Sequence, residues 1–466
     1  MESPRSVVGY SVSMKAGLLA ALLLIGCGGR DTSPLSVILI TLDTTRADHL
    51  GAYGYTRSIS PSLDAFARDA VVFQRAWSTS SWTLPAHASI LTGKNPTSHG
   101  AHNNLAAGSA SLGDVVPRAW FRHIKVNRLA ESEVTLAELL REKGYATAAF
   151  AGGPWLSPGF GLLQGYQFQD AEVKSAVGRP ANALTDAAIS WLESVPSEQA
   201  LHLLLNYFDP HYPYEPPPGF DDPPLASRQI PVNPSLINHG RPLQPGERET
   251  IVERYDAEIR FMDHQFGRLI QALKDLERYD NALIVVVADH GELLGEHSFI
   301  GHGRWLYEEL LRVPLFVRFP RGRRSGSKVN APLSLVDLLP LIAEELELLL
   351  PPGVEGVSVG ERRVVLAEVF RNGYAVKYYG VPFDRDLVAL IRWPWKLIVS
   401  DRGKSELFQL ETDSLEAHDR SGKQEERELR AELELARAAL SPPSVPAPAT
   451  VDPALREQLR GLGYIE

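Results

Sequence analysis

Three long apolar runs in this chain each end at an aspartate, and this arrangement limits the possible folds more than any other feature. The runs are Ser36–Leu42 (SVILITL), Leu201–Phe208 (LHLLLNYF) and Ala282–Ala288 (ALIVVVA). Continuous β-branched and aliphatic runs are typical of strands buried on both faces of a mostly parallel sheet. Ligand sites in open α/β sheets form beyond the carboxyl ends of such strands. The pattern therefore predicts an α/β sheet with a polar site at its edge.

The residues that follow these runs are of kinds that bind metal ions or transfer protons. Asp43 follows the first run, Asp209 and His211 follow the second, and Asp289 and His290 follow the third. Carboxylate and imidazole groups are the usual ligands of divalent cations. Asp209 precedes a proline, so for this residue a turn-forming role is the simpler interpretation.

A hydroxyl residue near a predicted helix start supplies another group. The segment at 80–93 reads SSWTLPAHASILTG. Pro85 suits the first turn of a helix, which would place Thr83 just before the helix N-terminus, where free backbone N–H groups favour an anion. An ordinary helix cap is the alternative. Together with the strand-end acids and imidazole, the segment predicts a cation shell that activates the Thr83 hydroxyl as a nucleophile.

We expect one divalent metal ion in this shell. An imidazole ligand favours Mn, Zn or Mg over a calcium cage built only of oxygens, and it leaves calcium open. The identity of the ion is not predicted.

Helical patterns at 60–70, 135–143 and 249–276 alternate with the strands and predict helices on both faces of the sheet. We expect the catalytic domain to cover residues 34–345. The proline-rich segment 215–247 is interpreted as a long loop near the site.

The composition changes after the catalytic domain. A crossing rich in proline and glycine is followed by short strand-like runs, such as Trp395–Ser400, and by a charged helical pattern at about 415–440. These features predict a smaller C-terminal α+β subdomain and tail over residues 360–466.

The first 27 residues are interpreted as a bacterial export signal. Lys15 precedes a short apolar run, Ala16–Ile25, and Gly26 precedes Cys27. The run has about half of the roughly 20 residues that a membrane-spanning helix needs. It resembles a lipoprotein signal, which implies acylation of Cys27, export, and anchoring on the periplasmic or outer cell surface. An uncleaved signal with an incidental cysteine is the alternative.

Charge and cysteine content exclude other classes. The chain has 57 acidic and 47 basic residues, a net charge of −10, and no Lys or Arg block that could follow phosphates. Nucleic acid is therefore not an expected partner. Cys27 is the single cysteine, so no internal disulfide can form.

Four segments resemble bacterial sulfatase-family proteins of the alkaline phosphatase superfamily. They are LITLDTTRADHLGAYGY, TLPAHASILTG, YFDPHYPYEPP and VVVADHGELLGEH, and the resemblance continues through VDLLPLI and WKLI to the final LRGLGYIE. It implies an alkaline phosphatase-like three-layer α/β/α sandwich with a smaller C-terminal α+β subdomain. These motifs are specific for the superfamily and much less so for the substrate.

The resemblance also implies roles for particular residues. Metal ligands would be Asp43, Thr83, Asp289 and His290, and Thr83 would be the nucleophile. Catalytic roles would fall to His87 and His211, and substrate contacts to Asn104 and His302. For His302 and His297, a structural role in a loop is an open alternative.

Three positions depart from the pattern of sulfatases. Thr83 stands where those enzymes have the Cys or Ser that becomes formylglycine, and threonine cannot be converted. His87 stands where they have arginine, and Thr44 where the family often has a second acid. The resemblance therefore implies the single-metal version, as in threonine-nucleophile phosphotransferases of the superfamily.

The expected function is metal-dependent hydrolysis of a phosphate mono- or diester, or of a sulfate ester, through a covalent threonyl intermediate. The substrate would be a small molecule or a glycan or lipid ester. One alternative is a transferase that moves a phosphoryl head group from lipid to an acceptor. Another is a non-catalytic binding lipoprotein, which the loss of a metal ligand would indicate; all four ligands are present.

Overall fold

The computed structural model describes residues 35–103, 110–111, 125–173, 178–220, 241–244, 246–373, 375–376 and 380–442. The predictions made for Cys27, for Asn104 and for the chain after residue 442 lie outside these residues. The same holds for most of the loop predicted at 215–247, of which 215–220, 241–244 and 246–247 are described. These residues contain neither helix nor strand, except that a helix begins at Glu247.

The described residues form an eight-stranded sheet with the strand order β13-β2-β12-β9-β1-β8-β6-β7. The three apolar runs are its neighbouring central strands β9, β1 and β8, which pair in parallel and are fully buried. Strand β12 pairs antiparallel with β9 and β2, so the sheet is mixed but mostly parallel, as predicted. The bounds are β1 Ser36–Leu42, β2 Val71–Phe73, β6 Ala146–Ala151, β7 Phe168–Asp170, β8 Leu201–Tyr207, β9 Ala282–Val287, β12 Leu315–Arg318 and β13 Lys328–Val329.

The register of the three central strands brings their carboxyl ends together. Thr41 of β1 lies opposite Asn206 of β8 on one side and Val287 of β9 on the other. The residues that follow these strands therefore leave the sheet at one edge.

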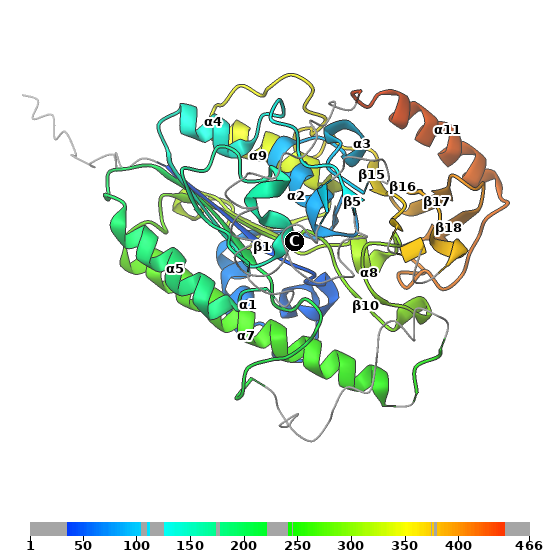
Figure 1. Cartoon of the computed structure of the whole chain (residues 1–466), viewed down its shortest axis with the longest axis horizontal. Helices are drawn as coiled ribbons and strands as arrows, with labels where there is room; N and C mark the ends of the chain where they lie inside the picture. The colour runs from blue at the N-terminus through cyan, green and yellow to red at the C-terminus, as the bar shows by residue number, and fades with distance from the viewer. Residues whose placement is uncertain are drawn as a thin grey trace, which may run out of the picture. The chain divides into compact units, whose positions relative to one another are not determined.

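Helices cover both faces of this sheet, with α1, α5 and α7 on one side and α2, α4 and α9 on the other (Figure 1). In α7, Tyr255, Ile259, Met262 and Phe266 are buried at the spacing of one helical face. The helices predicted at 60–70, 135–143 and 249–276 are α1, α4 and α7. The bounds are α1 Pro61–Asp69, α2 Thr83–Thr92, α3 Pro96–His99, α4 Leu136–Glu142, α5 Ala181–Ser194, α7 Glu247–Asp275, α8 Glu308–Leu311, α9 Leu338–Glu345 and α11 Gln424–Ala438.

A second sheet lies in the C-terminal part of the described chain. It is antiparallel, with the order β15-β16-β17-β18, and its β17 matches the predicted strand. Leu429 and Leu433 of α11 pack on Leu397 and Leu407 of this sheet. The bounds are β15 Val365–Val369, β16 Leu387–Arg392, β17 Trp395–Ser400 and β18 Ser405–Gln409.

The charged helix predicted from residue 415 begins only at Gln424, so its predicted start was wrong. The Asp413 carboxylate accepts hydrogen bonds from the N–H groups of Ala417 and His418, and Glu416 has a φ of 50°. Local side-chain bonds of this kind compete with helix formation. Residues 413–418 therefore form a turn.

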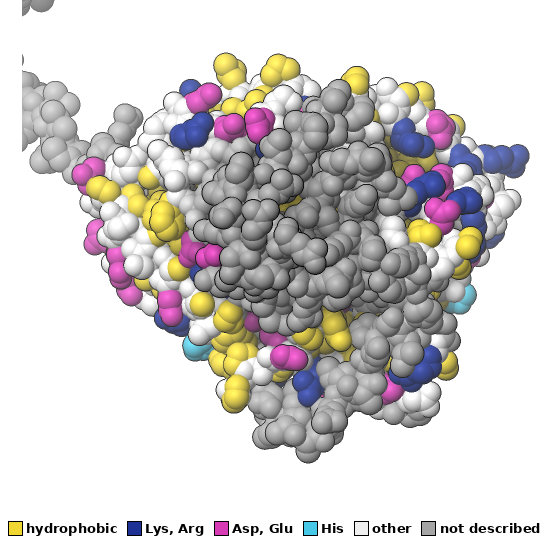
Figure 2. Space-filling model, viewed as in Figure 1, with side chains coloured by type: hydrophobic (Ala, Val, Ile, Leu, Met, Phe, Trp, Pro, Cys, Tyr) yellow, Lys and Arg dark blue, Asp and Glu magenta, His cyan; other side chains and the backbone are white. Residues whose placement is uncertain are grey.

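Three short strand pairs complete the described strands: β3 (Ala76–Trp77) with β14 (Leu333–Ser334), β4 (Ala110–Ser111) with β5 (Lys125–Val126), and β10 (Leu293–Leu294) with β11 (Ile300–Gly301). No helix within the described ranges has the length and apolarity to cross a membrane. On the face drawn in Figure 2, described side chains of both charges occur around the periphery.

Candidate active site

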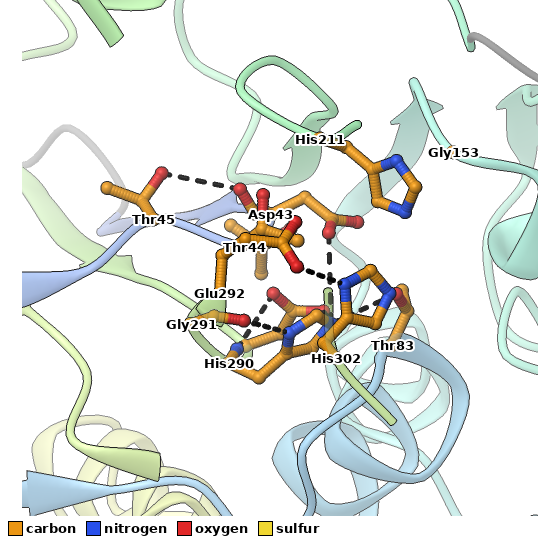
Figure 3. Close-up of polar contacts among 12 residues, drawn as sticks. Asp43, Thr44, Thr45, Thr83, Gly153, His211, His290, Gly291, Glu292 and His302 are labelled. Carbon is orange, nitrogen blue, oxygen red and sulfur yellow. Dashed lines mark hydrogen bonds and ion pairs between the residues drawn. The ribbon is translucent and has the colours of Figure 1, made fainter. Parts of the chain in front are cut away.

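Three predicted ligands meet at the shared strand edge. Asp43 follows β1, and Asp289 and His290 follow β9; none of the three is exposed. One ligand atom of each lies within 4.8 Å of the others. His290 Nε2 is 3.8 Å from Asp43 Oδ1 and 3.4 Å from Asp289 Oδ2. The side chains of Asp43 and His290 lie close together in Figure 3.

Thr83 reaches this cluster from the other layer. Its Oγ1 lies 3.3 Å from His290 Nε2. Thr83 is the first residue of α2 and Trp82 is the N-cap, so the helix begins one residue earlier than predicted. Every residue of α2 is buried. The packing around the helix therefore fixes the position of the hydroxyl, at an end where backbone N–H groups favour an anion.

The unpaired atoms of the cluster fit a divalent cation. Both carboxylate oxygens of Asp43 and Oδ2 of Asp289 are buried without a hydrogen bond. Asn206 and Thr83 lie near the Asp43 carboxyl, but neither reaches it with hydrogen-bond geometry. A buried charge without compensation is costly, and bound metal is one of its usual partners. Two carboxylates, an imidazole and a hydroxyl are a suitable donor set.

The two carboxyl groups differ in their pKa. Burial raises the pKa of Asp43 well above its ordinary value, and the nearby Asp289 and Glu292 add to the rise. Burial alone would raise the pKa of Asp289 too, but the charge of His290 and the interaction with the His87 ring lower it to about 2. Without a cation, the Asp43 carboxyl therefore favours its protonated form, while the Asp289 carboxyl is ionised.

His87 is engaged on both ring nitrogens. Nε2 lies 3.0 Å from Thr41 Oγ1, and Nδ1 lies 3.0 Å from the Thr83 carbonyl oxygen and 3.3 Å from Asp289 Oδ2. Asn206 Nδ2 donates to Thr41 Oγ1, which leaves the Thr41 hydroxyl hydrogen for His87 Nε2. This network assigns the proton to Nδ1, where it orients the first turn of α2 and Asp289. Both ring nitrogens of His87 therefore have partners within the protein, and its catalytic role stays a prediction.

His211 and His302 lie beside the cluster. The His302 ring centroid is 4.6 Å from that of His290 and 4.9 Å from that of His211. Burial lowers the pKa of His302 to about 4, and burial together with His302 lowers that of His211 to about 3. Both imidazoles are therefore neutral at neutral pH. The Nδ1–H of His211 donates to the Tyr212 carbonyl oxygen at 2.6 Å, so His211 Nε2 is a hydrogen-bond acceptor.

Glu292 was not singled out from the sequence. It is fully buried, and its Oε1 lies 3.0 Å from His302 Nδ1, while its Oε2 has no hydrogen bond. Burial raises the pKa of Glu292 to about 7. The signal that could have found it is the acid two residues after His290.

Thr44 was noted only as a departure from the family pattern. It has a φ of 52°, a region that β-branched residues rarely adopt, and its Oγ1 is buried without a hydrogen bond. The Tyr255 hydroxyl donates to the Thr44 carbonyl oxygen and accepts from the Arg46 N–H, which holds this turn. Strain of about 1–3 kcal/mol is common at functional sites.

The residue after His290, Gly291, lies where a side chain would not fit. A Cβ at this position would lie 2.0 Å from the carbonyl oxygen of Glu309. The Gly291 N–H donates to the carbonyl oxygen of Leu310 at 2.8 Å. The close approach of α8 therefore leaves no room for a side chain.

Asp209 and His297, which were also considered from the sequence, lie outside the cluster around Asp43. The Asp209 carboxylate accepts the N–H of Ala181 at the start of α5, which agrees with the turn-forming interpretation. His297 lies in a separate cluster with Glu309 and Glu416.

The fold and the strand-end cluster define a protein of the alkaline phosphatase superfamily. The family model described as Sulfatase matches residues 36–347. The chain belongs to the sulfatase family, whose class of reaction is ester hydrolysis. The model described as N-sulphoglucosamine sulphohydrolase, C-terminal, matches residues 295–441.

Known proteins that resemble the chain include an ulvan-active sulfatase of Formosa agariphila, 24% identical over 70% of this chain and 64% of that relative. Among solved structures, one determined in complex with D-glucosamine-2-N,6-O-disulfate aligns with a TM-score of 0.68 at 17% identity, over 86% of this chain and 96% of the other. The phosphonate monoester hydrolase of Agrobacterium radiobacter aligns with a TM-score of 0.66 at 20% identity, over 91% of this chain and 96% of the other. At these identities the structures establish the fold alone.

Proposed function

We propose that this chain hydrolyses phosphate mono- or diesters through Thr83, and that sulfate esters are poorer substrates. The observation that carries the proposal is the position of Thr83 Oγ1, buried at the N-terminus of α2 and 3.3 Å from His290 Nε2. Hydroxyl nucleophiles of this kind need activation, and the cluster beside Thr83 is suited to it.

Asp43, Asp289 and His290, with Thr83, would hold one divalent cation. When bound, such an ion lowers the pKa of the hydroxyl and neutralises charge on the transferred group. The imidazole favours Zn or Mn, and Mg or Ca remain candidates.

In the first step, Thr83 Oγ1 loses its proton to water and forms a bond to phosphorus while the bond from phosphorus to the leaving oxygen breaks. The product is a phosphothreonine, and the leaving oxygen takes a proton. Water supplies this proton, and the neutral rings of His211 and His302 lie beside the cluster, where we assign them contacts to the bound ester. In the second step, water attacks phosphorus, the bond to Thr83 Oγ1 breaks, and a proton from the attacking water returns to Thr83 Oγ1. The N–H groups at the start of α2 stabilise the anion in both steps.

The preference for phosphate follows from the side chain at position 83. Sulfatases release sulfate through the aldehyde hydrate of formylglycine, and threonine cannot form that group. A phosphothreonine can instead be cleaved by attack at phosphorus. The resemblance in fold to a phosphonate monoester hydrolase is compatible with phosphoryl substrates.

A sulfated glycan is the second candidate substrate. The names of two similar proteins refer to ulvan and to D-glucosamine-2-N,6-O-disulfate, which favours this class. Transfer of a phosphoryl head group from lipid and a non-catalytic role in binding are two further functions that the rates below also test.

Rates on matched aryl phosphate, bis-aryl phosphate, aryl phosphonate and aryl sulfate substrates test the proposal. We expect kcat/KM for the best phosphoryl substrate to exceed that for the sulfate by at least about a hundredfold, or about 3 kcal/mol. Asp43→Asn, assayed in parallel, controls for contaminating enzymes. Faster cleavage of the sulfate by the wild type alone would contradict the proposal and favour the glycan candidate. Hydrolysis of none of the four esters would contradict it as well and favour transfer or binding.

We also propose that the protein is exported and anchored in a bacterial membrane through an acyl group on Cys27. The apolar run before Cys27 supports this proposal. Metabolic labelling with a fatty acid should mark the wild type and not Cys27→Ala. Equal labelling of the two proteins, or none in either, would argue against the anchor.

A further inference from the structure

A second cluster of potential ligands lies away from the active site. It consists of His297, Glu309 and Glu416, each of which offers one ligand atom within 4.8 Å of the others. His297 lies between β10 and β11, Glu309 lies in α8, and Glu416 follows β18 (Figure 1). His297 Nε2 is 3.3 Å from Glu309 Oε2. The cluster thus joins three segments that are distant in sequence.

The buried charges around this cluster do not balance. Glu308, Glu309 and Glu416 are all buried, and the ammonium group among them is that of Lys396. Lys396 Nζ lies 3.0 Å from Glu308 Oε1 and 2.9 Å from Glu416 Oε1. Three carboxylates and one ammonium leave an excess of two negative charges when His297 is neutral. A divalent cation has the charge that balances this excess.

An unpaired atom points independently to a ligand. Glu309 is only 6% exposed, and its Oε1 is buried without a hydrogen bond. Glu309 and His297 both line a cavity of about 480 Å³, whose wall also includes Arg46, His49 and Arg248. An unpaired carboxylate oxygen beside a cavity is a costly arrangement unless a ligand occupies it.

We propose that His297, Glu309 and Glu416 hold a second divalent cation. One imidazole and two carboxylates form a ligand set that suits Zn or Mn better than Ca. Since Glu416 follows β18 and Glu309 lies in α8, the ion joins the C-terminal sheet segment to α8. The carbonyl oxygen of Leu310 in α8 accepts the Gly291 N–H, so this ion also supports the loop that carries His290.

Protonation is the competing explanation for the charge excess. Burial opposes it, but the hydrogen bond and charge of Glu309 raise the pKa of His297. Burial also raises the pKa of Glu416 to about 7, against the effect of Lys396. A protonated His297 and a protonated Glu416 would balance the cluster without an ion. The number of bound ions separates the two explanations.

The test measures bound Zn or Mn in the purified, metal-stripped protein after equilibrium dialysis against each ion alone. The wild type should bind two ions per chain. Glu309→Gln and His297→Gln should each bind one, because each removes a ligand of the second site. Asp289→Asn should also retain one, since it alters the active-site cluster. Glu361→Gln, at an exposed position, is the matched control and should bind two.

Thermal unfolding gives a second readout. Added Zn or Mn should raise the Tm of Asp289→Asn by several degrees through the second site, and this rise should be absent when Glu309→Gln is combined with Asp289→Asn. If Glu309→Gln does not fold, His297→Gln decides, because His297 is only partly buried.

The outcomes separate this inference from the proposed function. One ion in the wild type that Asp289→Asn abolishes overturns the second site and leaves the active-site cation intact. One ion that Glu309→Gln abolishes and Asp289→Asn retains supports the second site and contradicts the first. Equal binding by the wild type and Glu309→Gln also overturns the inference.

Discussion

Replacing Thr83 by alanine should lower kcat for the preferred phosphate ester by about 10⁴-fold or more, because the hydroxyl that accepts the phosphoryl group is removed. Binding of the ester should change far less, since the N-terminus of α2 and the other three proposed ligands, Asp43, Asp289 and His290, remain. Steady-state kinetics should therefore show the loss in kcat and not chiefly in KM.

Thr83→Ser is the matched variant, because serine keeps the hydroxyl and loses the methyl group. It should retain part of the activity, reduced by the freer rotation of its side chain. Mass spectrometry of the acid-quenched wild type should find phosphate on Thr83, and Thr83→Ala should carry none. Full activity of Thr83→Ala would remove this residue from the mechanism.

Removing one active-site ligand should remove the ion held there. Asp289→Ala and His290→Ala should each lose metal that the wild type retains, and activity should fall by about a thousandfold or more, since the hydroxyl loses its activation. Metal analysis of the three purified proteins, together with assays after chelation and re-addition of Zn or Mn, measures both effects.

Asp209→Ala is a suitable control for this comparison. It removes a partly buried acid from a neighbouring strand end, but its carboxylate caps α5 and does not belong to the ion cluster. We expect it to keep its active-site metal while losing stability. Equal metal content in the wild type, Asp289→Ala and His290→Ala would exclude these two residues as ligands.

The central strands could be predicted because the composition of each short run indicates that it is buried. Continuous β-branched runs such as Ser36–Leu42 require cover on both faces, and an acid at the end of such a run marks the edge of the sheet. The parallel order β9-β1-β8 was not read from the sequence, but it follows once the ends must share a site. Asp43, Asp289 and His290 were predicted as a set for this reason, and the structure brings them together.

Residues whose role depends on distant contacts could not be predicted in the same way. Glu292 follows His290 closely, yet its importance appears only through burial and through His302. The unusual backbone of Thr44 depends on Tyr255, which lies in α7. The start of α11 was misplaced because Asp413 bonds to the following N–H groups, a local arrangement that a charged helical pattern conceals.

The strand order β9-β1-β8 also has a consequence for how the protein folds. Parallel pairing of residues 36–42 with 201–207 and 282–287 requires the closure of very long loops, which slows folding. Until β9 pairs with β1, Asp43 and His290 are not held close to each other. Tight binding of the cation therefore requires the folded sheet. An ion that binds the folded state more tightly than the unfolded state shifts the equilibrium toward the native state. A cell that limits the supply of that ion would thereby limit the amount of folded protein as well as its turnover.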